Sequence, residues 1–203
     1  MKIICVGRNY LEHAKEMNAG TPKEPVIFLK PDTALLKPGH TFYLPSFSTE
    51  VHYETELVIK ISKNCKHVEE QFSSRYYNEI TVGIDFTARD LQARLKASGL
   101  PWELSKSFDG SAPVGKFFPV EKLRDKQTVP FRLQLNGKKV QEGNSKDMIF
   151  SIDHVVAFVS RFITLCKGDL IFTGTPSGVG PVAKGDHLEA YLEENKVLEV
   201  HVK

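Results

Sequence analysis

Short strand-like segments outnumber helical ones in this sequence of 203 residues, and no regular alternation of strand and helix runs through it. The clearest local signal lies at 131–141, where two strand-like runs flank Asn136-Gly137. Asn-Gly accepts the positive φ angles of a type I′ turn, so this segment predicts a β-hairpin. Hairpins without regular strand–helix alternation favour a β-rich α+β fold, with mixed β-sheets curled around one core and a few short helices.

Apolar periodicity places the remaining elements. Strands are expected at 3–6, 26–30, 80–86, 170–173, 188–192 and 197–202, the last two as a closing pair. A helix is expected at 11–17, and a second after Thr87, a predicted N-cap because Asp90 follows three residues later. That helix should end at Gly99. A third helix at 151–162 is expected to bury Ile152, Val155, Val156, Val159 and Phe162.

Composition excludes several classes of protein. Lys and Arg total 27 against 25 for Asp and Glu, which gives a formal net charge of only +2. This near-balance gives no sign of a broad basic surface that would bind nucleic acid or membranes. Cys5, Cys65 and Cys166 are isolated, which argues against a zinc motif or a disulfide framework. The apolar run at 3–6 is too short for a signal peptide, and no run approaches the roughly 20 residues of a membrane span. We expect one cytoplasmic domain over 1–203, with no nucleic-acid or membrane partner.

Two carboxylates distinguish the segment 51–61. Leu57, Ile59 and Ile61 alternate on one face of the expected strand, which places Glu54 and Glu56 on the other, beside His52 and Val58. Carboxylates roughly 7 Å apart along a strand repel each other unless a cation lies between them. A solvated polar face is the ordinary interpretation of one such pair, so a third acidic residue is needed to indicate a metal site.

Asp85 is the candidate for that third residue. It lies near the end of the apolar run 80–86, where an ionised carboxylate needs a partner because an unpaired buried charge is costly. A capping or turn aspartate is the alternative. Together, Glu54, Glu56 and Asp85 would form an all-oxygen site, which suits Mg²⁺ or Mn²⁺ better than zinc.

Several ordered motifs resemble the fumarylacetoacetate hydrolase family, close to its short acylpyruvate hydrolase members. They are Gly7-Arg8-Asn9-Tyr10 with His13 and Glu16, Lys30-Pro31, His52-Tyr53-Glu54-x-Glu56, Gly83-x-Asp85-x-Thr87-Ala88-Arg89-Asp90-x-Gln92, Lys106-x-Phe108-Asp109 and Gly168-Asp169-x-Ile171-x-Thr173-Gly174-Thr175-Pro176-x-Gly178-Val179-Gly180. The resemblance covers essentially the whole chain. It implies a sandwich-like roll of mixed sheets, usually a homodimer, with Glu54, Glu56 and Asp85 as ligands of Mg²⁺ or Mn²⁺ that the substrate's carboxylate and keto oxygen chelate.

The resemblance also implies catalytic residues. His13 and Glu16 would lie in a lid segment and act as a dyad that activates water. Their spacing of three places both on one face of a helix, where a carboxylate raises the basicity of the imidazole. An exposed pair on an amphipathic helix is the alternative. Lys106 would stabilise a developing enolate, although the sequence alone fits a surface lysine equally well.

Further residues are candidates for substrate contacts. Arg8 and Tyr10 follow the first strand and would line the mouth of the pocket. Arg89 and Gln92 lie on the first helical turns after Asp85, and Arg89 is equally suited to a structural salt bridge. Thr175 and the neighbouring glycine amides would hold a carboxylate or oxyanion, unless the loop is only a tight turn. Lys30 is the last candidate. It precedes Asp32, where family members often carry a small neutral residue, so the charge near Lys30 differs from the family pattern.

The sequence therefore predicts a metal-dependent hydrolase that cleaves a carbon–carbon bond of small 2,4-diketo acids (acylpyruvates) to pyruvate and a carboxylic acid. His13 would deprotonate water, and the metal and Lys106 would hold the pyruvate enolate. Oxaloacetate decarboxylation and isomerisation of a hydroxymuconate-type diacid are alternatives that use the same site. A non-catalytic β-domain with structural Ca²⁺ is the alternative outside the enzymes.

Overall fold

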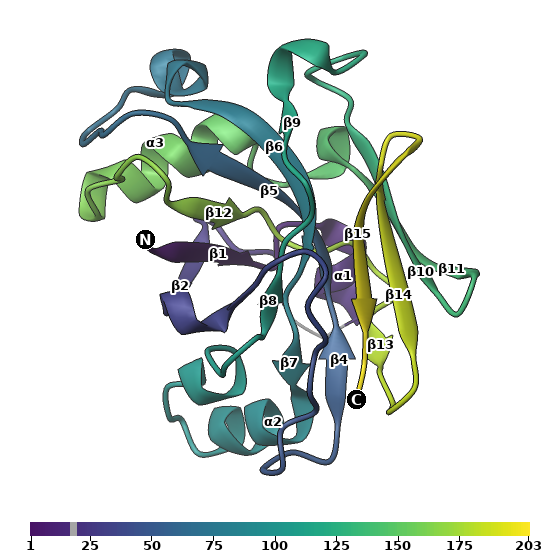
Figure 1. Ribbon diagram of the computed structural model, residues 1–203. Coiled ribbons are helices and arrows are strands. Elements are labelled where there is room, and N and C mark those ends of the chain that lie inside the picture. The colour runs from purple at the N-terminus through teal and green to yellow at the C-terminus, as the bar shows by residue number, and fades with distance from the viewer. Residues whose placement is uncertain (17–19) are drawn as a thin grey trace.

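The computed structural model describes residues 1–16 and 20–203, and its largest element is a mixed six-stranded sheet. The strand order is β2 (Val26–Lys30), β1 (Ile3–Gly7), β12 (Leu170–Phe172), β5 (Thr55–Ile61), β6 (Tyr77–Ile84) and β9 (Phe118–Pro119). β1 and β12 run parallel and the other neighbours antiparallel (Figure 1).

Three smaller sheets complete the β-structure of the described residues. A four-stranded antiparallel sheet has the order β11 (Lys138–Asn144), β10 (Pro130–Leu135), β14 (His187–Leu192) and β15 (Asn195–His201). A three-stranded sheet has the order β13 (Gly180–Pro181), β4 (Val51–Tyr53) and β7 (Thr87–Ala88). β3 (Leu35–Leu36) pairs in parallel with β8 (Ala112–Pro113). The β-rich α+β class with several sheets is therefore confirmed, although only the six-stranded sheet of these four is mixed.

The main core lies between one face of the six-stranded sheet, the four-stranded sheet and helix α3 (Ile152–Phe162). It includes Leu57, Ile59 and Ile61 from β5, which alternate inward as the sequence predicts. A second, smaller cluster that includes Val58 and Phe172 covers the opposite face. The six-stranded sheet is therefore buried on both faces, whereas the sequence predicts a single core.

The Asn-Gly hairpin forms as predicted between β10 and β11. Asn136 and Gly137 have φ angles of 51° and 77°, as a type I′ turn requires. β14 and β15 form the expected closing pair. Helix α1 (Leu11–Glu16) matches the predicted 11–17, although Met17 lies outside the described residues.

Three local predictions are wrong. The segment 51–61 is broken at Glu54, because β4 pairs with β13 and β7 while β5 joins the six-stranded sheet. Thr87 is not an N-cap, since it lies in β7 and helix α2 (Arg89–Ala97) begins after Ala88 without a side-chain cap. Phe162 is 68% exposed at the end of α3, and Phe158 is buried instead.

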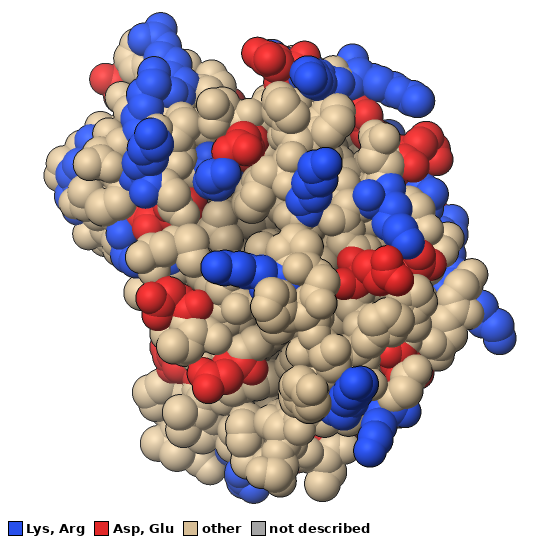
Figure 2. Space-filling view, viewed as in Figure 1, with Lys and Arg blue, Asp and Glu red and all other residues tan. Residues whose placement is uncertain are grey.

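Charged side chains of both signs are interspersed over the face drawn in Figure 2, in line with the near-neutral composition. Among the described residues, no helix is long and apolar enough to cross a membrane. At the lower end of the molecule in Figure 1, α2 lies against β4 and β7, and this arrangement brings its first turn to the carboxylates described next.

Candidate functional site

Glu54, Glu56 and Asp85, here called the cavity cluster, converge on one point. Glu54 occupies the break between β4 and β5, Glu56 lies in β5, and Asp85 follows β6. The β5–β6 register places Thr55 opposite Ile84, and the Asp85 amide donates to the Glu54 carbonyl at 2.8 Å. One carboxylate oxygen from each residue lies within 4.8 Å of the others, and no member is more than 6% exposed. The structure thus brings together the three carboxylates that the sequence predicts to meet.

Cations surround two of these carboxylates. Lys106 Nζ lies 2.8 Å from Glu54 Oε2 and 2.6 Å from Asp85 Oδ2, and it also donates to Thr87 Oγ1 at 2.6 Å. Arg89 Nη2 reaches Glu54 Oε1 at 2.5 Å, which confirms its salt-bridge interpretation. Burial disfavours the charged forms, but Lys106 and Arg89 hold the pKa of Glu54 below its ordinary value. In the same way, Asp85 and Glu54 outweigh burial and raise the pKa of Lys106.

Glu56 is in a different electrostatic position. Its Oε2 accepts a hydrogen bond from the Gly174 amide at 2.6 Å, and among the described residues no cation lies within ion-pair distance. Burial, Asp85 and Glu54 all raise the pKa of Glu56 well above its ordinary value. A buried carboxylate without a cationic partner, beside two further carboxylates, fits the ligand set of a hard divalent ion such as Mg²⁺ or Mn²⁺.

The cavity cluster opens into a cavity of about 200 Å³. Predicted site residues that line this cavity are Arg8, His13, Arg89, Gln92, Lys106 and Thr175. Gln92 accepts a hydrogen bond from Arg89 Nη1 at 2.7 Å, and Thr175 Oγ1 accepts one from Gln141 Nε2 at 2.9 Å. The lining is therefore polar and cationic around the carboxylates, and the space suits a small organic acid.

His13 and Glu16 form the predicted pair on α1. His13 Nδ1 lies 3.2 Å from Glu16 Oε2, and the imidazole is buried against the cavity. Glu16 Oε1 in turn accepts a hydrogen bond from the Gly178 amide at 3.1 Å. Because Nδ1 is engaged by Glu16, Nε2 remains for a proton of substrate or water, as a general base requires.

The glycine-rich loop after β12 acts differently from the prediction. Its Gly174 and Gly178 amides donate hydrogen bonds to the protein carboxylates Glu56 and Glu16, whereas the sequence predicts that they bind a substrate. Gly174 has φ of 98°, and a Cβ there would lie 2.6 Å from the Cβ of Asn9. Only glycine therefore allows this loop to bring its amide to Glu56.

Two predicted substrate contacts lie outside the cavity lining. The Lys30 side chain is fully buried, with Nζ 2.7 Å from Asp85 Oδ1 and 2.9 Å from Ser111 Oγ. Tyr10 belongs to the main core, where its ring packs edge-on against Phe131 with centroids 6.4 Å apart. Lys30 is thus placed to orient Asp85, and Tyr10 to position the segment that carries Arg8.

Lys96 is a cavity residue that the sequence analysis missed. It follows Arg89 and Gln92 at the spacing of one helix face, so that all three line the cavity. Its Nζ lies 5.7 Å from the ring centroid of Trp102, which also lines the cavity. Burial and the neighbouring charges of Arg89, Lys106 and Arg8 lower the pKa of Lys96. Continuing the helical period from Arg89 would have identified this residue.

Comparisons with known proteins find related sequences and related structures. The fumarylacetoacetate (FAA) hydrolase C-terminal family matches residues 2–203. The chain is 45% identical over 188 residues to the Homo sapiens protein "Oxaloacetate tautomerase FAHD1, mitochondrial". The aligned residues cover 93% of this chain and 85% of that protein. Since the name of that relative places it in mitochondria, the cytoplasmic location stays a prediction.

Solved structures are similar over the whole chain. Fumarylpyruvate hydrolase from Pseudomonas aeruginosa, in complex with Mn²⁺ and pyruvate, superposes with a TM-score of 0.93 at 37% identity, covering 100% of this chain and 89% of that one. 2-Hydroxyhepta-2,4-diene-1,7-dioate isomerase from Mycobacterium marinum gives a TM-score of 0.86 at 36% identity, covering 99% and 73%. The relatives therefore include hydrolases, isomerases and tautomerases.

Proposed function

The chain belongs to the fumarylacetoacetate hydrolase family, and we propose that it is a divalent-metal-dependent enzyme that interconverts the keto and enol forms of an oxaloacetate-type 2-keto dicarboxylic acid. The observation that supports this most directly is the meeting of the cavity cluster with the His13–Glu16 pair in one small cavity. The first provides oxygen ligands for Mg²⁺ or Mn²⁺, and the second provides a base.

Each residue has a defined task in this proposal. Glu54, Glu56 and Asp85 would hold the metal ion, which acts as a Lewis acid toward the oxygens of a bound 2-keto acid. His13 would take the proton from the carbon next to the keto group and deliver it to the oxygen of the resulting enolate, while Glu16 fixes the tautomer of the imidazole. Lys106 supplies positive charge beside the same carboxylates, where charge develops on enolisation.

Two cavity cations favour a dicarboxylate over a monocarboxylate. Arg89 and Lys106 are paired with the cavity cluster, whereas Arg8 and Lys96 line the cavity without an ion pair to any described carboxylate. Arg8 is held there with φ of 59°, an uncommon backbone angle for a residue other than glycine. Oxaloacetate, fumarylpyruvate and a heptadiene-dioate, which appear in the names of the relatives, all carry a second carboxylate. Arg8 and Lys96 are suited to bind that group.

Hydrolysis of 2,4-diketo acids (acylpyruvates) is the second candidate. It is favoured by the hydrolase among the similar structures, and by a base that could take its proton from water instead of carbon. Decarboxylation of oxaloacetate and isomerisation of a hydroxymuconate-type diacid would use the same cavity. The homodimer implied by the family resemblance also stays a proposal, which sedimentation of the full chain would test.

The experiment compares two substrates in two variants. Oxaloacetate, a dicarboxylate, and acetylpyruvate, a monocarboxylate, are assayed with Mg²⁺ and with Mn²⁺ for decay of the enol absorbance and for pyruvate release. Lys96→Met should raise KM for oxaloacetate about 10- to 100-fold, since hydrogen bonds to charged groups contribute about 1.5–3 kcal/mol. The same variant should leave the kinetics of acetylpyruvate nearly unchanged.

Arg94→Met is the matched control, because Arg94 is an exposed cation on the same helix. It should behave as wild type with both substrates. Faster turnover of acetylpyruvate than of the oxaloacetate enol by the wild-type protein would favour the hydrolase. Equal losses with both substrates in Lys96→Met would contradict the role of Lys96, and inactivity on all 2-keto acids would contradict the proposed function itself.

A further inference from the structure

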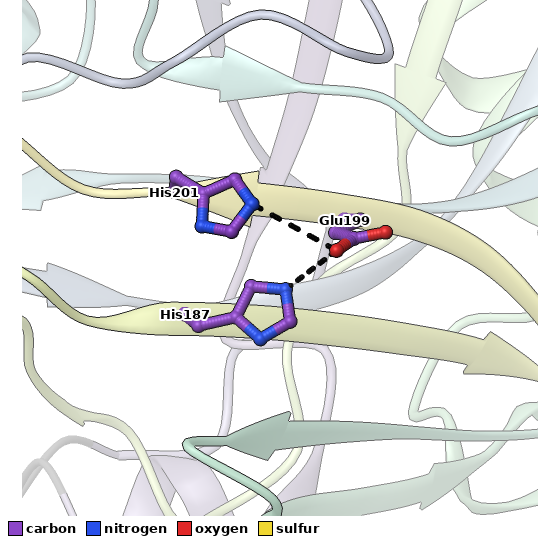
Figure 3. A group of neighbouring side chains, drawn as sticks. All are labelled: His187, Glu199 and His201. Atoms are coloured by element: carbon purple, nitrogen blue, oxygen red, sulfur yellow. Dashed lines mark hydrogen bonds and ion pairs between the residues drawn. The ribbon is translucent and has the colours of Figure 1, made fainter.

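A second group of potential metal ligands lies on the surface, at the open end of the β14–β15 hairpin. His187, Glu199 and His201, here called the hairpin cluster, come from two paired strands (Figure 3). His187 lies directly opposite His201 in the register, and Glu199 precedes His201 by two residues, so that all three project from one face. One ligand atom of each lies within 4.8 Å of the others.

The two imidazoles point the same nitrogen at one carboxylate oxygen. His187 Nε2 lies 2.8 Å and His201 Nε2 3.8 Å from Glu199 Oε1, and dashed lines mark these two pairs in Figure 3. The rings are nearly parallel, with centroids 4.5 Å apart and an interplanar angle of 12°. The three potential ligand atoms therefore lie close enough together for one metal ion to bridge them in place of the present hydrogen bond and ion pair.

Neighbouring contacts hold this arrangement in place. Lys196 Nζ lies 3.2 Å from Glu199 Oε2, which leaves Oε1 directed at the histidines. The backbone amide of His187 donates to Asn136 Oδ1 at 2.9 Å, and its carbonyl accepts from the Asn136 amide at 2.8 Å. Contacts that fix the orientation of ligands raise the affinity of a metal site. Lys196 also adds a positive charge nearby, which works against any cation.

From this geometry we propose that the hairpin cluster is a surface site for a divalent transition-metal ion, Zn²⁺, Ni²⁺ or Cu²⁺, with His187 Nε2, His201 Nε2 and Glu199 Oε1 as ligands. Two imidazoles and one carboxylate suit these ions and not Mg²⁺, which prefers oxygen. Tetrahedral bonds of about 2.1 Å need ligand atoms roughly 3.4 Å apart, a separation that small side-chain rotations achieve here.

Exposure makes the site accessible and leaves a coordination position for water. The side chains of His187, Glu199 and His201 are 30%, 45% and 63% exposed. A hollow beside Glu199 and His201 is also lined by His40, which gives a hydrated ion room. A bound ion would join β14 to β15 close to the C-terminus and stabilise that end of the hairpin.

The test is a calorimetric titration of the full-length protein with Zn²⁺ in excess Mg²⁺, together with electron paramagnetic resonance of the Cu²⁺-loaded protein. Wild type should bind Zn²⁺ at the hairpin cluster, and the Cu²⁺ spectrum should show coupling to imidazole nitrogen. His187→Asn and His201→Asn should each weaken this binding about 100-fold, because losing a ligand costs at least as much as losing a contact that orients one.

His154→Asn is the matched control, since His154 is an exposed imidazole paired with a single carboxylate, Glu70, at 2.9 Å. It should retain the wild-type affinity and spectrum. The proposal is overturned if the wild type binds no Zn²⁺, or if its Zn²⁺ binding persists in both His187→Asn and His201→Asn. It is also overturned if His154→Asn loses the ion equally. Circular dichroism of each variant separates loss of the ligand from loss of fold.

Discussion

The cavity cluster and the hairpin cluster bring three ligand side chains together in opposite ways. The cavity cluster takes its members from 54–56 and from Asp85, and it also depends on Lys106 and on the Gly174 loop. The hairpin cluster lies within one pair of neighbouring strands, whose register aligns its members, with support from Lys196 and Asn136. The first therefore requires the whole fold, whereas the second requires only the hairpin and its immediate neighbours.

Glu56 and Glu199 show what burial does to one side-chain type. Burial and two neighbouring carboxylates raise the pKa of Glu56 well above its ordinary value. Hydrogen bonds from Lys196 and His187 lower the pKa of the exposed Glu199. The buried carboxylate of Glu56 has no cationic partner among the described residues, and a divalent ion would supply one. The exposed carboxylate of Glu199 already has partners with which an ion must compete. We therefore expect metal binding to have a much larger effect at the cavity cluster.

The strongest test of this contrast exchanges Glu for Gln at each cluster. Glu56→Gln should lower kcat/KM with Mg²⁺ about 1,000-fold, since the loss of Lewis-acid stabilisation costs several kcal/mol. The fold should survive, because Gln resembles the neutral carboxyl that the raised pKa of Glu56 favours. Melting temperature with and without Mg²⁺ should show that the stabilisation by the ion is lost.

Glu199→Gln provides the other half of the comparison. Glu199 lies outside the cavity lining, so kcat/KM of this variant on oxaloacetate should match that of wild type. Its Zn²⁺ affinity should fall, because a ligand of the hairpin cluster is removed. If Glu56→Gln retained both Mg²⁺-dependent stability and turnover, the cavity cluster would not be the metal site. If Glu199→Gln lost activity, the two clusters would not be independent.

A second large effect is expected at His13. His13→Ala should lower kcat about 100- to 10,000-fold, the usual contribution of a general base. Metal binding should remain, because His13 is not a member of the cavity cluster. Oxalate, which resembles a pyruvate enolate, should therefore still raise the melting temperature of this variant when Mg²⁺ is present.

His154→Ala, which removes an exposed histidine on α3, is the control and should keep full turnover. The variant also distinguishes the candidate reactions. Tautomerisation and acylpyruvate hydrolysis both need the base, whereas decarboxylation of oxaloacetate needs no activated water and should persist in His13→Ala. Full tautomerase activity without His13 would contradict its assignment.

The sequence predicts local structure and ligand chemistry better than it predicts contacts across the fold. The Asn136-Gly137 hairpin and the alternation of Leu57, Ile59 and Ile61 follow from local geometry, and both are confirmed. The convergence of the three carboxylates was predicted from their chemistry and from the family resemblance. The break at Glu54 was not, because it arises when β4 leaves the six-stranded sheet to pair with β13 and β7.

The residues misplaced by sequence reasoning share a physical cause. Lys30 is a candidate through the Lys30-Pro31 motif of the family resemblance, but its long side chain extends inward to Asp85 and Ser111. The amides of Gly174 and Gly178 are equally able to bind a substrate or a protein carboxylate, and only tertiary packing decides between them. Thr87 was misassigned as an N-cap because β-pairing with His52 outweighs its local preference.

Asp90, three residues after that rejected cap, gives the smallest expected effect. Burial opposes its charge, but hydrogen bonds from Ser48 and from the Thr49 and Leu91 amides together outweigh it and lower the pKa of Asp90 to about 2 from the ordinary value of 3.8. These contacts tie the first turn of α2, which carries Arg89 and Gln92 into the cavity, to the segment before β4. The hairpin cluster has no such dependence on α2.

Asp90→Asn should therefore destabilise the protein by about 1 kcal/mol at pH 7, which lowers the melting temperature by about 2–4 °C in a chain of this size. Because the pKa is lowered in the folded state, the stabilisation is complete above the ordinary pKa and is lost as pH falls through about 2. The difference between wild type and Asp90→Asn should thus shrink when melts are repeated from pH 7 down to pH 3. At pH 7, Asp90→Asn should leave the Zn²⁺ affinity unchanged, since among the described residues no hydrogen bond or ion pair joins the hairpin cluster to α2. A difference in melting temperature that is the same at every pH would instead assign the effect of Asp90 to packing, and the cavity would not depend on this ionised contact.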